Sequence, residues 1–520
     1  MALYSRGQAR RSLIDTVAFR VISQTATILG YVVMVRGMSK EDFGVFNLLY
    51  AVVPVVSTVG SFGLEHTLRR FQPEYLSVGD TAAATWLVRF VASARFGATL
   101  FVLGIILSFW NHAAPFFKLT AYRAEFLILC LLVVVHFQAR VLELSLSAHM
   151  LQRVSVGASA VVAVVKLAAY SVLGWMDALT LELALIVDTV AIAVAYLVLL
   201  FFHRRHCVSN VQTAHFGPNA VERRRLVRYG VFNSFNEAGG LFLDSNTDNF
   251  FIAALLDTGS VGIYSFYTRL NDMAQNLLPA RLFQNVIQPL FFAVPPADAE
   301  RKVPLYFSFL VNLNLVWQWP VLAFTIAYHA EIVQVFFGGK FIEHSWMLPT
   351  ICAFAFCNVI EWPVTLVAQY QERAGVMLLS KIFAIYNIAA LLLLIPAFGI
   401  GGAAIASGSA QAMKYAFIWW RVRRLARWTN ARMALLASIT LWSGVVLTCQ
   451  LMKPLSVGRP IISLGVGVVV VIAALLVHVR GPALAGADRA ILASLVRDNE
   501  AGILRRIGLL RGAGTHREHT

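Results

Sequence analysis

The segment "GSVGIYSFYTRLNDMAQNLL", residues 259–278, decides the fold because it has a counterpart in the first half of the chain. Residues 41–50, "EDFGVFNLLY", also place a glycine, an aliphatic residue and an aromatic residue together, as Gly44-Val45-Phe46 against Gly262-Ile263-Tyr264. Both segments follow a short turn, and both of the apolar stretches that follow end near a Gln-Pro pair, Gln72-Pro73 and Gln288-Pro289. The match predicts an internal repeat.

The composition is that of a membrane protein. Of the 520 residues, 58% are hydrophobic and only 13% are charged, and the mean hydropathy is +0.70. Apolar stretches long enough to cross a bilayer recur along nearly the whole chain, and about fourteen can be drawn, among them 44–68, 180–202, 229–256 and 261–283. The sequence therefore predicts an all-α, polytopic membrane protein.

Arginine-rich segments alternate with segments that carry few cations. The N-terminal "RGQARR", the central "HRRHC" and the later "RVRRLAR" all fall on one side if the spans alternate. Because cationic loops stay in the cytoplasm, both termini are expected there. The net charge of +16 is thus a topology signal, and no nucleic-acid partner is expected.

The repeat divides the chain into two lobes of about six helices in the same orientation, a parallel repeat about an axis along the membrane normal. Such repeats rock against each other around a central cavity, which indicates transport. The last segment could be an interfacial helix on the membrane or a loosely ordered tail. The predicted regions are an N-lobe (1–205), a basic linker (206–228), a C-lobe (229–425), two further helices (426–480) and a basic cytoplasmic tail (481–520).

Several cations lie inside predicted spans, where each charge costs about 2.5–3.5 kcal/mol at the helix centre. Such charges usually face a water-filled cavity, and guanidinium groups match phosphate oxygens, so a basic cavity for a diphosphate is expected. Two other roles stay open, namely snorkelling to the headgroups and, for Arg140, an ion pair with Glu143. The candidate anion ligands are Arg20, Arg95, Arg140, Lys166, Arg269 and Lys381.

Acidic residues recur along the span 229–256, which has no basic partner on its own helix. Glu237, Asp244 and Asp248 could pair with cations of other helices or bind a coupling ion, with Asn387 as a further oxygen ligand. Asp272, one turn from Arg269, is expected to position or neutralise that arginine. No cofactor is predicted other than a coupling H⁺ or Na⁺, the latter at Asp248, and no firm metal site is predicted. The chain lacks a Walker A motif and a catalytic constellation, so we expect no enzyme.

Four segments resemble a known family. They are "GMSKEDFGVFNLLYAVVPVVSTVGSFGLEHTLRRFQPEY" (37–75), "LLDTGSVGIYSFYTRLNDM" (255–273), "FFGGKFIEHSWMLPTICAF" (336–354) and "FGIGGAAIASGSAQ" (398–411). In order and spacing the chain resembles the polysaccharide and O-antigen (Wzx-type) flippases of the multidrug/oligosaccharidyl-lipid/polysaccharide exporter superfamily, which are related to lipid II flippases.

The resemblance implies a flippase that moves a polyprenyl-diphosphate-linked oligosaccharide from the cytoplasmic to the periplasmic leaflet of the bacterial inner membrane. Its implied partners are membrane lipid and the polymerase and chain-length or export machinery of exopolysaccharide, capsule or O-antigen assembly. It also implies that Arg269 meets the diphosphate, with Arg20 as its first-lobe partner. The lipid II flippases carry an Arg-Asp pair on the first helix, whereas Val21 follows Arg20 here.

Two other functions remain open. The first is a drug or metabolite antiporter of the same superfamily, driven by a cation, although such cavities suit organic cations better than a row of arginines does. The second is a membrane enzyme, a polysaccharide polymerase or ligase, although these usually carry a large periplasmic loop that this sequence lacks.

Overall fold

The structure is a computed structural model of the whole chain. It describes residues 6–149, 151–208, 220–243, 245–279, 291–292, 294–429, 431–456, 458–481, 484 and 488–491. The predicted tail lies largely outside these residues, as do Asp244, the pair Gln288-Pro289 and much of the linker. The chain divides into two compact units, residues 1–265 and 266–520, each of which is described by itself.

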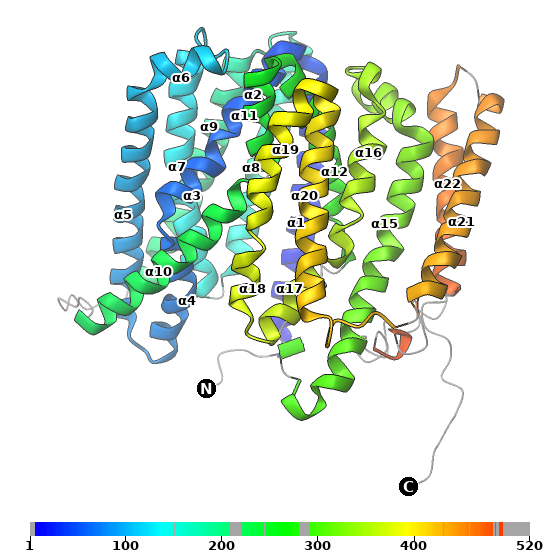
Figure 1. Cartoon of the computed structure of the whole chain (residues 1–520). Helices are drawn as coiled ribbons and strands as arrows, with labels where there is room; N and C mark the ends of the chain where they lie inside the picture. The colour runs from blue at the N-terminus through cyan, green and yellow to red at the C-terminus, as the bar shows by residue number, and fades with distance from the viewer. Residues whose placement is uncertain are drawn as a thin grey trace. The chain divides into compact units, whose positions relative to one another are not determined.

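Helices make up both units, and no strand occurs in the described part of the chain, which confirms the all-α class (Figure 1). Ten of the described helical segments are long and apolar enough to cross a membrane, so a multi-pass membrane protein is confirmed. The count of about fourteen spans is not confirmed. One reason is that three of the predicted spans, 44–68, 229–256 and 261–283, do not form single long apolar helices.

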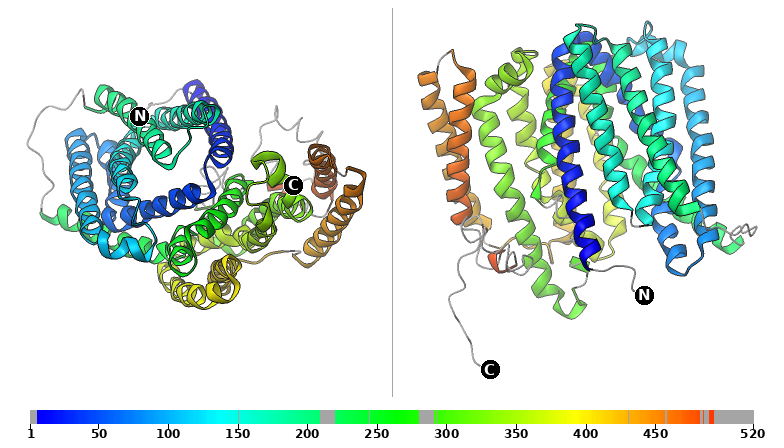
Figure 2. Two further views of the ribbon diagram at one scale, coloured as in Figure 1. Left: turned by 90° about the horizontal axis from the view of Figure 1, so that it is seen from above. Right: turned by 180° about the vertical axis from the view of Figure 1, so that it is seen from behind.

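The first unit contains the helices up to the start of α12, and α12 itself crosses the boundary between the units. In the first unit α1 packs along α8, and α7 packs against α9 (Figure 2). The helices are α1 (Arg6–Gly37), α2 (Lys40–Tyr50), α3 (Val52–Ser61), α4 (Leu64–Ser77), α5 (Thr81–Ser108), α6 (Trp110–Phe116), α7 (Arg123–Ala148), α8 (Gln152–Trp175), α9 (Leu181–His203), α10 (Ala220–Leu241), α11 (Ser245–Leu255) and α12 (Thr258–Gln275).

The predicted span 44–68 is broken where α3 ends and α4 begins. Phe62 and Gly63 both adopt left-handed backbone conformations, with φ of 42° and 67°. A Cβ atom at Gly63 would overlap the carbonyl oxygen of Gly230 in α10, so the position requires glycine in both conformation and space. The break starts a new helix in the middle of the span, with Glu65 in its first turn.

The two glycines of the internal repeat touch each other. A Cβ atom at Gly262 would lie 3.1 Å from the Cα atom of Gly44, and one at Gly44 would overlap the carbonyl oxygen of Thr258. The helices that carry them begin alike, because Ser39 accepts a hydrogen bond from the Asp42 amide (2.9 Å) and Asp257 accepts one from the Ser260 amide (2.7 Å). The two segments that match in sequence thus share a capped helix start, and their equivalent glycines are in contact.

Helix α10 begins within the segment predicted as linker, and an ion pair fixes its first part to α4. Arg225 donates two hydrogen bonds to the Glu74 carboxylate, at 3.0 and 3.3 Å, and its guanidinium lies 4.8 Å from the centre of the Phe71 ring. The hydrogen bond from Arg225 is the main cause that lowers the pKa of Glu74, which Arg70 lowers further. The sequence "VERRRLVR" therefore serves as helix rather than as a connecting loop.

The second unit is built around the long helix α15, which contacts α16, α17, α21 and α22. A kink divides α15 at Tyr328, whose φ of −128° and ψ of 21° are not helical. The two C-terminal helices lie side by side and pack on α15 (Figure 2). The helices are α15 (Ala299–Phe337), α16 (Met347–Ala355), α17 (Asn358–Tyr370), α18 (Ala374–Leu379), α19 (Ile382–Phe398), α20 (Ile400–Val422), α21 (Ala431–Met452) and α22 (Pro460–Arg480).

We expect Gly44→Ala to destabilise the protein by about 1–3 kcal/mol, because the added methyl group has to displace the backbone of the repeat partner. The matched control is Gly97→Ala in α5, where a Cβ atom would meet nothing within 4 Å. The measurement is the thermal unfolding temperature of both purified variants in detergent. Equal temperatures for the two variants would contradict the close contact.

Candidate functional site

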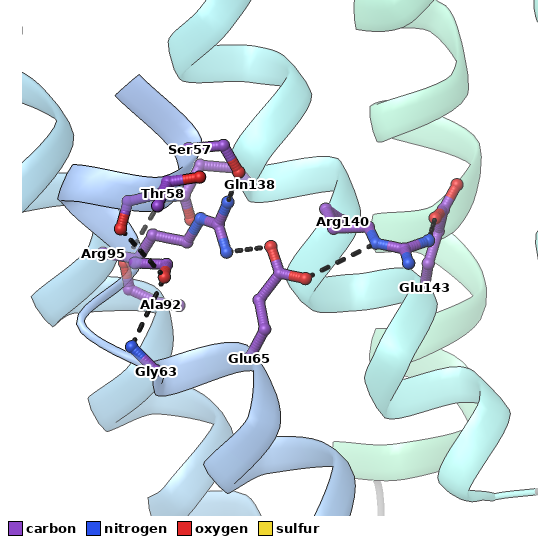
Figure 3. Close-up of polar contacts among 10 residues, drawn as sticks. Ser57, Thr58, Gly63, Glu65, Ala92, Arg95, Gln138, Arg140 and Glu143 are labelled. Carbon is purple, nitrogen blue, oxygen red and sulfur yellow. Dashed lines mark hydrogen bonds and ion pairs between the residues drawn. The ribbon is translucent and has the colours of Figure 1, made fainter. Parts of the chain in front are cut away.

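Four charged side chains form an alternating chain inside the first unit, which we call the arginine–glutamate network: Arg95, Glu65, Arg140 and Glu143. Glu65 lies between the two arginines and pairs with both of them (Figure 3). Three elements contribute, since Glu65 lies in the first turn of α4, Arg95 lies in the middle of α5, and the other two belong to α7. The break at Gly63 therefore sets the position of the central carboxylate.

Arg95 is fully enclosed by this network. Its side chain is 1% exposed and pairs with Glu65, and its guanidinium lies over the Phe137 ring, 4.4 Å from the ring centre. The Ser57 hydroxyl accepts a further hydrogen bond at 3.4 Å. A buried guanidinium is tolerated only when it is paired in this way. The structure thus places Arg95 inside the packing of the first unit, away from any accessible surface.

Arg140 is the accessible member of the network. Its side chain is 41% exposed, and it lies 2.9 Å from Glu143 and 3.7 Å from Glu65. The intrahelical pair with Glu143 is thus present, and it leaves part of the guanidinium open. A guanidinium has five N–H donors, so Arg140 can hold its carboxylates and still contact an anion.

Lys166 in α8 pairs with a carboxylate that the sequence analysis did not single out. Its ammonium group lies 2.7 Å from Asp188 in α9, a residue with no exposed surface. Tyr50 and Tyr170 also donate hydrogen bonds to Asp188. The three donors satisfy the buried carboxylate, and Lys166 is its counterion. The primary contact of Lys166 is therefore structural.

Arg269, Arg20 and Lys381 differ from the cations of the first unit that form ion pairs. Arg269 and Arg20 are exposed, Lys381 is half-buried, and none of the three forms an ion pair with a described side chain. In α12 the exposed Asp272 follows Arg269 at helical spacing, and the exposed Asn276 lies directly after the helix ends at Gln275, so the three continue one polar stripe. The structure does not join Arg269 and Asp272 in an ion pair.

The predicted acidic site has separate surroundings. Asp248 in α11 is buried and accepts a hydrogen bond from the Tyr264 hydroxyl at 2.6 Å. Asn387 belongs to the second unit, is buried, and accepts a hydrogen bond from Ser407 at 3.2 Å. The side chain of Glu237 lies outside the described part of the chain, as Asp244 does. Among the described residues no three His, Cys, Asp or Glu side chains are grouped as a metal site.

Sequence reasoning missed Glu65 and Asp188, the two carboxylates that pair with predicted ligands. Each is an acidic residue within a predicted apolar span, in "VGSFGLEHT" and "LALIVDTVAIAV". A charge in such a position requires a partner, and that signal was available in the sequence. The identity of the partner was not, because Arg95, Arg140 and Lys166 lie on other helices.

These features define a multi-pass helical membrane protein in which some intramembrane cations are paired with carboxylates and others, such as Arg20 and Arg269, are exposed. Residues 11–294 match a family described as polysaccharide biosynthesis protein. The match covers more than half of the chain, and the chain belongs to this family. No curated protein sequence matches it.

Two solved structures show the same fold. One is the lipid II flippase MurJ in an inward closed conformation, with a TM-score of 0.65, 12% identity, and coverage of 89% of this chain and 99% of that one. The other is an inward-facing multidrug resistance MATE family transporter of the MOP superfamily, with a TM-score of 0.64, 11% identity, and coverage of 80% and 99%. The fold expected from the resemblance is thereby confirmed.

We expect Arg95→Gln to destabilise the protein by about 3 kcal/mol, because Glu65 loses its buried partner. Arg269→Gln should change stability by no more than about 0.5 kcal/mol, because that side chain is exposed and forms no ion pair with a described residue. Thermal unfolding of the two purified variants separates these roles. A larger loss in the Arg269 variant would contradict the assignment.

Proposed function

We propose that this protein is a flippase that moves a polyprenyl-diphosphate-linked oligosaccharide from the cytoplasmic to the periplasmic leaflet of the inner membrane. The glycan then enters the assembly of a surface polysaccharide, by way of a polymerase and chain-length or export machinery. Membership of the polysaccharide biosynthesis family supports this proposal, as does the likeness in fold to a lipid II flippase.

The observation that carries the proposal is the exposed polar stripe of α12. Arg269 and Asp272 are accessible on one face of α12, and Asn276 is accessible directly after the end of this helix. A charged side chain in lipid is costly, so such a face borders a water-filled space. A planar guanidinium donates two parallel hydrogen bonds to phosphate oxygens, which makes Arg269 the first candidate ligand of a lipid diphosphate.

The ion pairs of the first unit separate the candidate ligands that already have a carboxylate partner from those that are exposed. Arg95 and Lys166 already have carboxylate partners on neighbouring helices and therefore have a structural role. Arg20 is exposed and is proposed as a further diphosphate ligand. Arg140 is half-exposed and can exchange Glu143 for a phosphate oxygen without losing Glu65. Lys381 is half-buried and adds positive charge in the second unit.

Transport requires the lobes to rock, and a cation gradient is the proposed driving force. Asp248 is the candidate carboxylate for a coupling H⁺ or Na⁺, because it is buried and its partner Tyr264 can reorient when the charge changes. In the proposed topology both termini are cytoplasmic. The Gly44 and Gly262 contact then lies near the periplasmic ends of α2 and α12.

The alternative from the same superfamily, a cation-coupled drug or metabolite antiporter, is supported by the likeness in fold to a MATE family transporter. The exposed arginines favour an anionic substrate instead. An enzyme that polymerises or ligates prenyl-linked glycans would also recognise a diphosphate. Glycan polymerisation by the purified protein alone would favour that enzyme over the flippase.

We expect Arg269→Gln combined with Arg20→Gln to reduce surface polysaccharide at least about tenfold in a null strain, because each charge-assisted bond to phosphate contributes about 1.5–3 kcal/mol. Arg269→Lys should export more than Arg269→Gln, because lysine keeps the charge. It should export less than the wild type, because lysine loses the bidentate geometry. The measurement is surface polysaccharide per unit of membrane protein.

The matched control is Arg424→Gln, which removes an exposed arginine that pairs with the exposed Glu300 at 2.6 Å. Its export should equal that of the wild type. Normal export by the double variant, at wild-type protein level, would exclude the diphosphate role of both arginines.

A further inference from the structure

The first part of α10 has an exposed face that carries both arginine and valine. Helix α10 crosses α3 and α4 obliquely, and its first turns lie at the edge of the first unit (Figure 1). Four exposed residues follow one another there at helical spacing and share one face: Arg224, Val227, Arg228 and Val231. None of them belongs to the proposed diphosphate site. We call these four residues the outer face of α10.

The opposite face of α10 is packed, so the orientation of the outer face is fixed. Leu226 is buried in a core cluster with residues of α4, α5 and α7. The ring of Tyr229 contacts the ring of Phe71 edge-on, with 5.4 Å between the ring centres. Arg225, at the side of the helix, is held by Glu74 of α4. The helix therefore cannot turn its outer face inward without breaking these contacts.

Arginines outnumber the described carboxylates on this surface. Glu74 accepts hydrogen bonds from both Arg70 and Arg225, so one carboxylate serves two guanidinium groups. Arg224 and Arg228 are exposed and form no ion pair with a described side chain. They lie one helical turn apart, with about 5–6 Å between their Cβ atoms, so both can contact one phosphate group. The surface is therefore cationic and complements an anion.

The valines of the outer face indicate that this anion has an apolar part. Val227 is 60% exposed and Val231 is 44% exposed. A soluble anion would leave both side chains in water, whereas an interfacial helix places its apolar side chains among acyl chains while its arginines contact the headgroups. Arg228 directly precedes the predicted span 229–256, which places the outer face at the level of the headgroups.

We propose that the outer face of α10 binds an anionic phospholipid of the surrounding membrane. Arg224 and Arg228 donate hydrogen bonds to its phosphate oxygens, and Val227 and Val231 contact its acyl chains. Phosphatidylcholine has the same phosphate but adds a quaternary ammonium group, which the neighbouring arginines of α4 and α10 repel. In the proposed topology the lipid belongs to the cytoplasmic leaflet, and it holds the start of α10 at the membrane.

The experiment is native mass spectrometry of the full-length protein, titrated with phosphatidylglycerol or with phosphatidylcholine of the same acyl chains. We expect the wild type to bind phosphatidylglycerol at least about tenfold more tightly, because two arginines contact the anionic headgroup. Equal binding of the two lipids would overturn the proposal.

Two double variants locate the site. Arg224→Gln with Arg228→Gln should lose about tenfold in affinity for phosphatidylglycerol and little for phosphatidylcholine. Val227→Asn with Val231→Asn should weaken both lipids by a similar factor of about fivefold, because the acyl chains lose an apolar contact. Unchanged binding of phosphatidylglycerol in either double variant would overturn the proposal, since a merely solvated face would give that result.

The matched control is Arg423→Gln with Arg424→Gln, which removes two exposed arginines at the end of α20. It should bind both lipids as the wild type does, and an equal loss there would show a general effect of charge and overturn the site. A third titration uses a prenyl diphosphate, whose binding the arginine double variant should leave unchanged. An equal loss of the prenyl diphosphate would assign the outer face to the transported lipid and overturn the phospholipid as its ligand.

Discussion

A charged side chain inside a membrane protein must be paired or must face water, and this constraint organises the structure. In the first unit Glu65 pairs with Arg95 and Arg140, and Asp188 pairs with Lys166. Each pair joins different helices, so the charges that would be costly in lipid hold the bundle together instead. The exposed cations are then the ones that remain for a ligand.

Two glycine contacts give this arrangement its geometry. Gly44 and Gly262 touch at the repeat, and capped helix starts precede both of them. Gly63 packs against Gly230 between α3 and α4, and α4 begins at Leu64, which places Glu65 in its first turn beside the arginines. The glycine contacts thus determine which helices approach closely. The position of the Glu65 carboxylate is then set by the point at which α4 begins.

The sequence predicted the helical class, the repeat and the presence of intramembrane charge, because each depends on local composition or on self-similarity. It did not predict which cations are paired. Helical periodicity places Arg95 on a face of its own helix, but the partner Glu65 is supplied by another helix after a break. Phe62 carries no sign of its left-handed conformation in its residue type, so the span 44–68 looked continuous.

The start of α10 was missed for a similar reason. An arginine-rich segment after a polar stretch is typical of a cytoplasmic linker, and only the pairing of Arg225 with Glu74 reveals a packed helix. Of the predicted anion ligands, the structure separates those with carboxylate partners from those without. The distinction depends on side chains from three or more helices, and a single sequence does not show which of these side chains are in contact.

Recognition of a diphosphate by Arg269 is tested most directly by a binding measurement. The purified protein in nanodiscs is titrated with one prenyl-linked sugar as its monophosphate and as its diphosphate. The wild type should bind the diphosphate at least about tenfold more tightly, and Arg269→Gln should lose this preference. Equal affinities in the wild type, or an unchanged preference in the variant, would contradict the account.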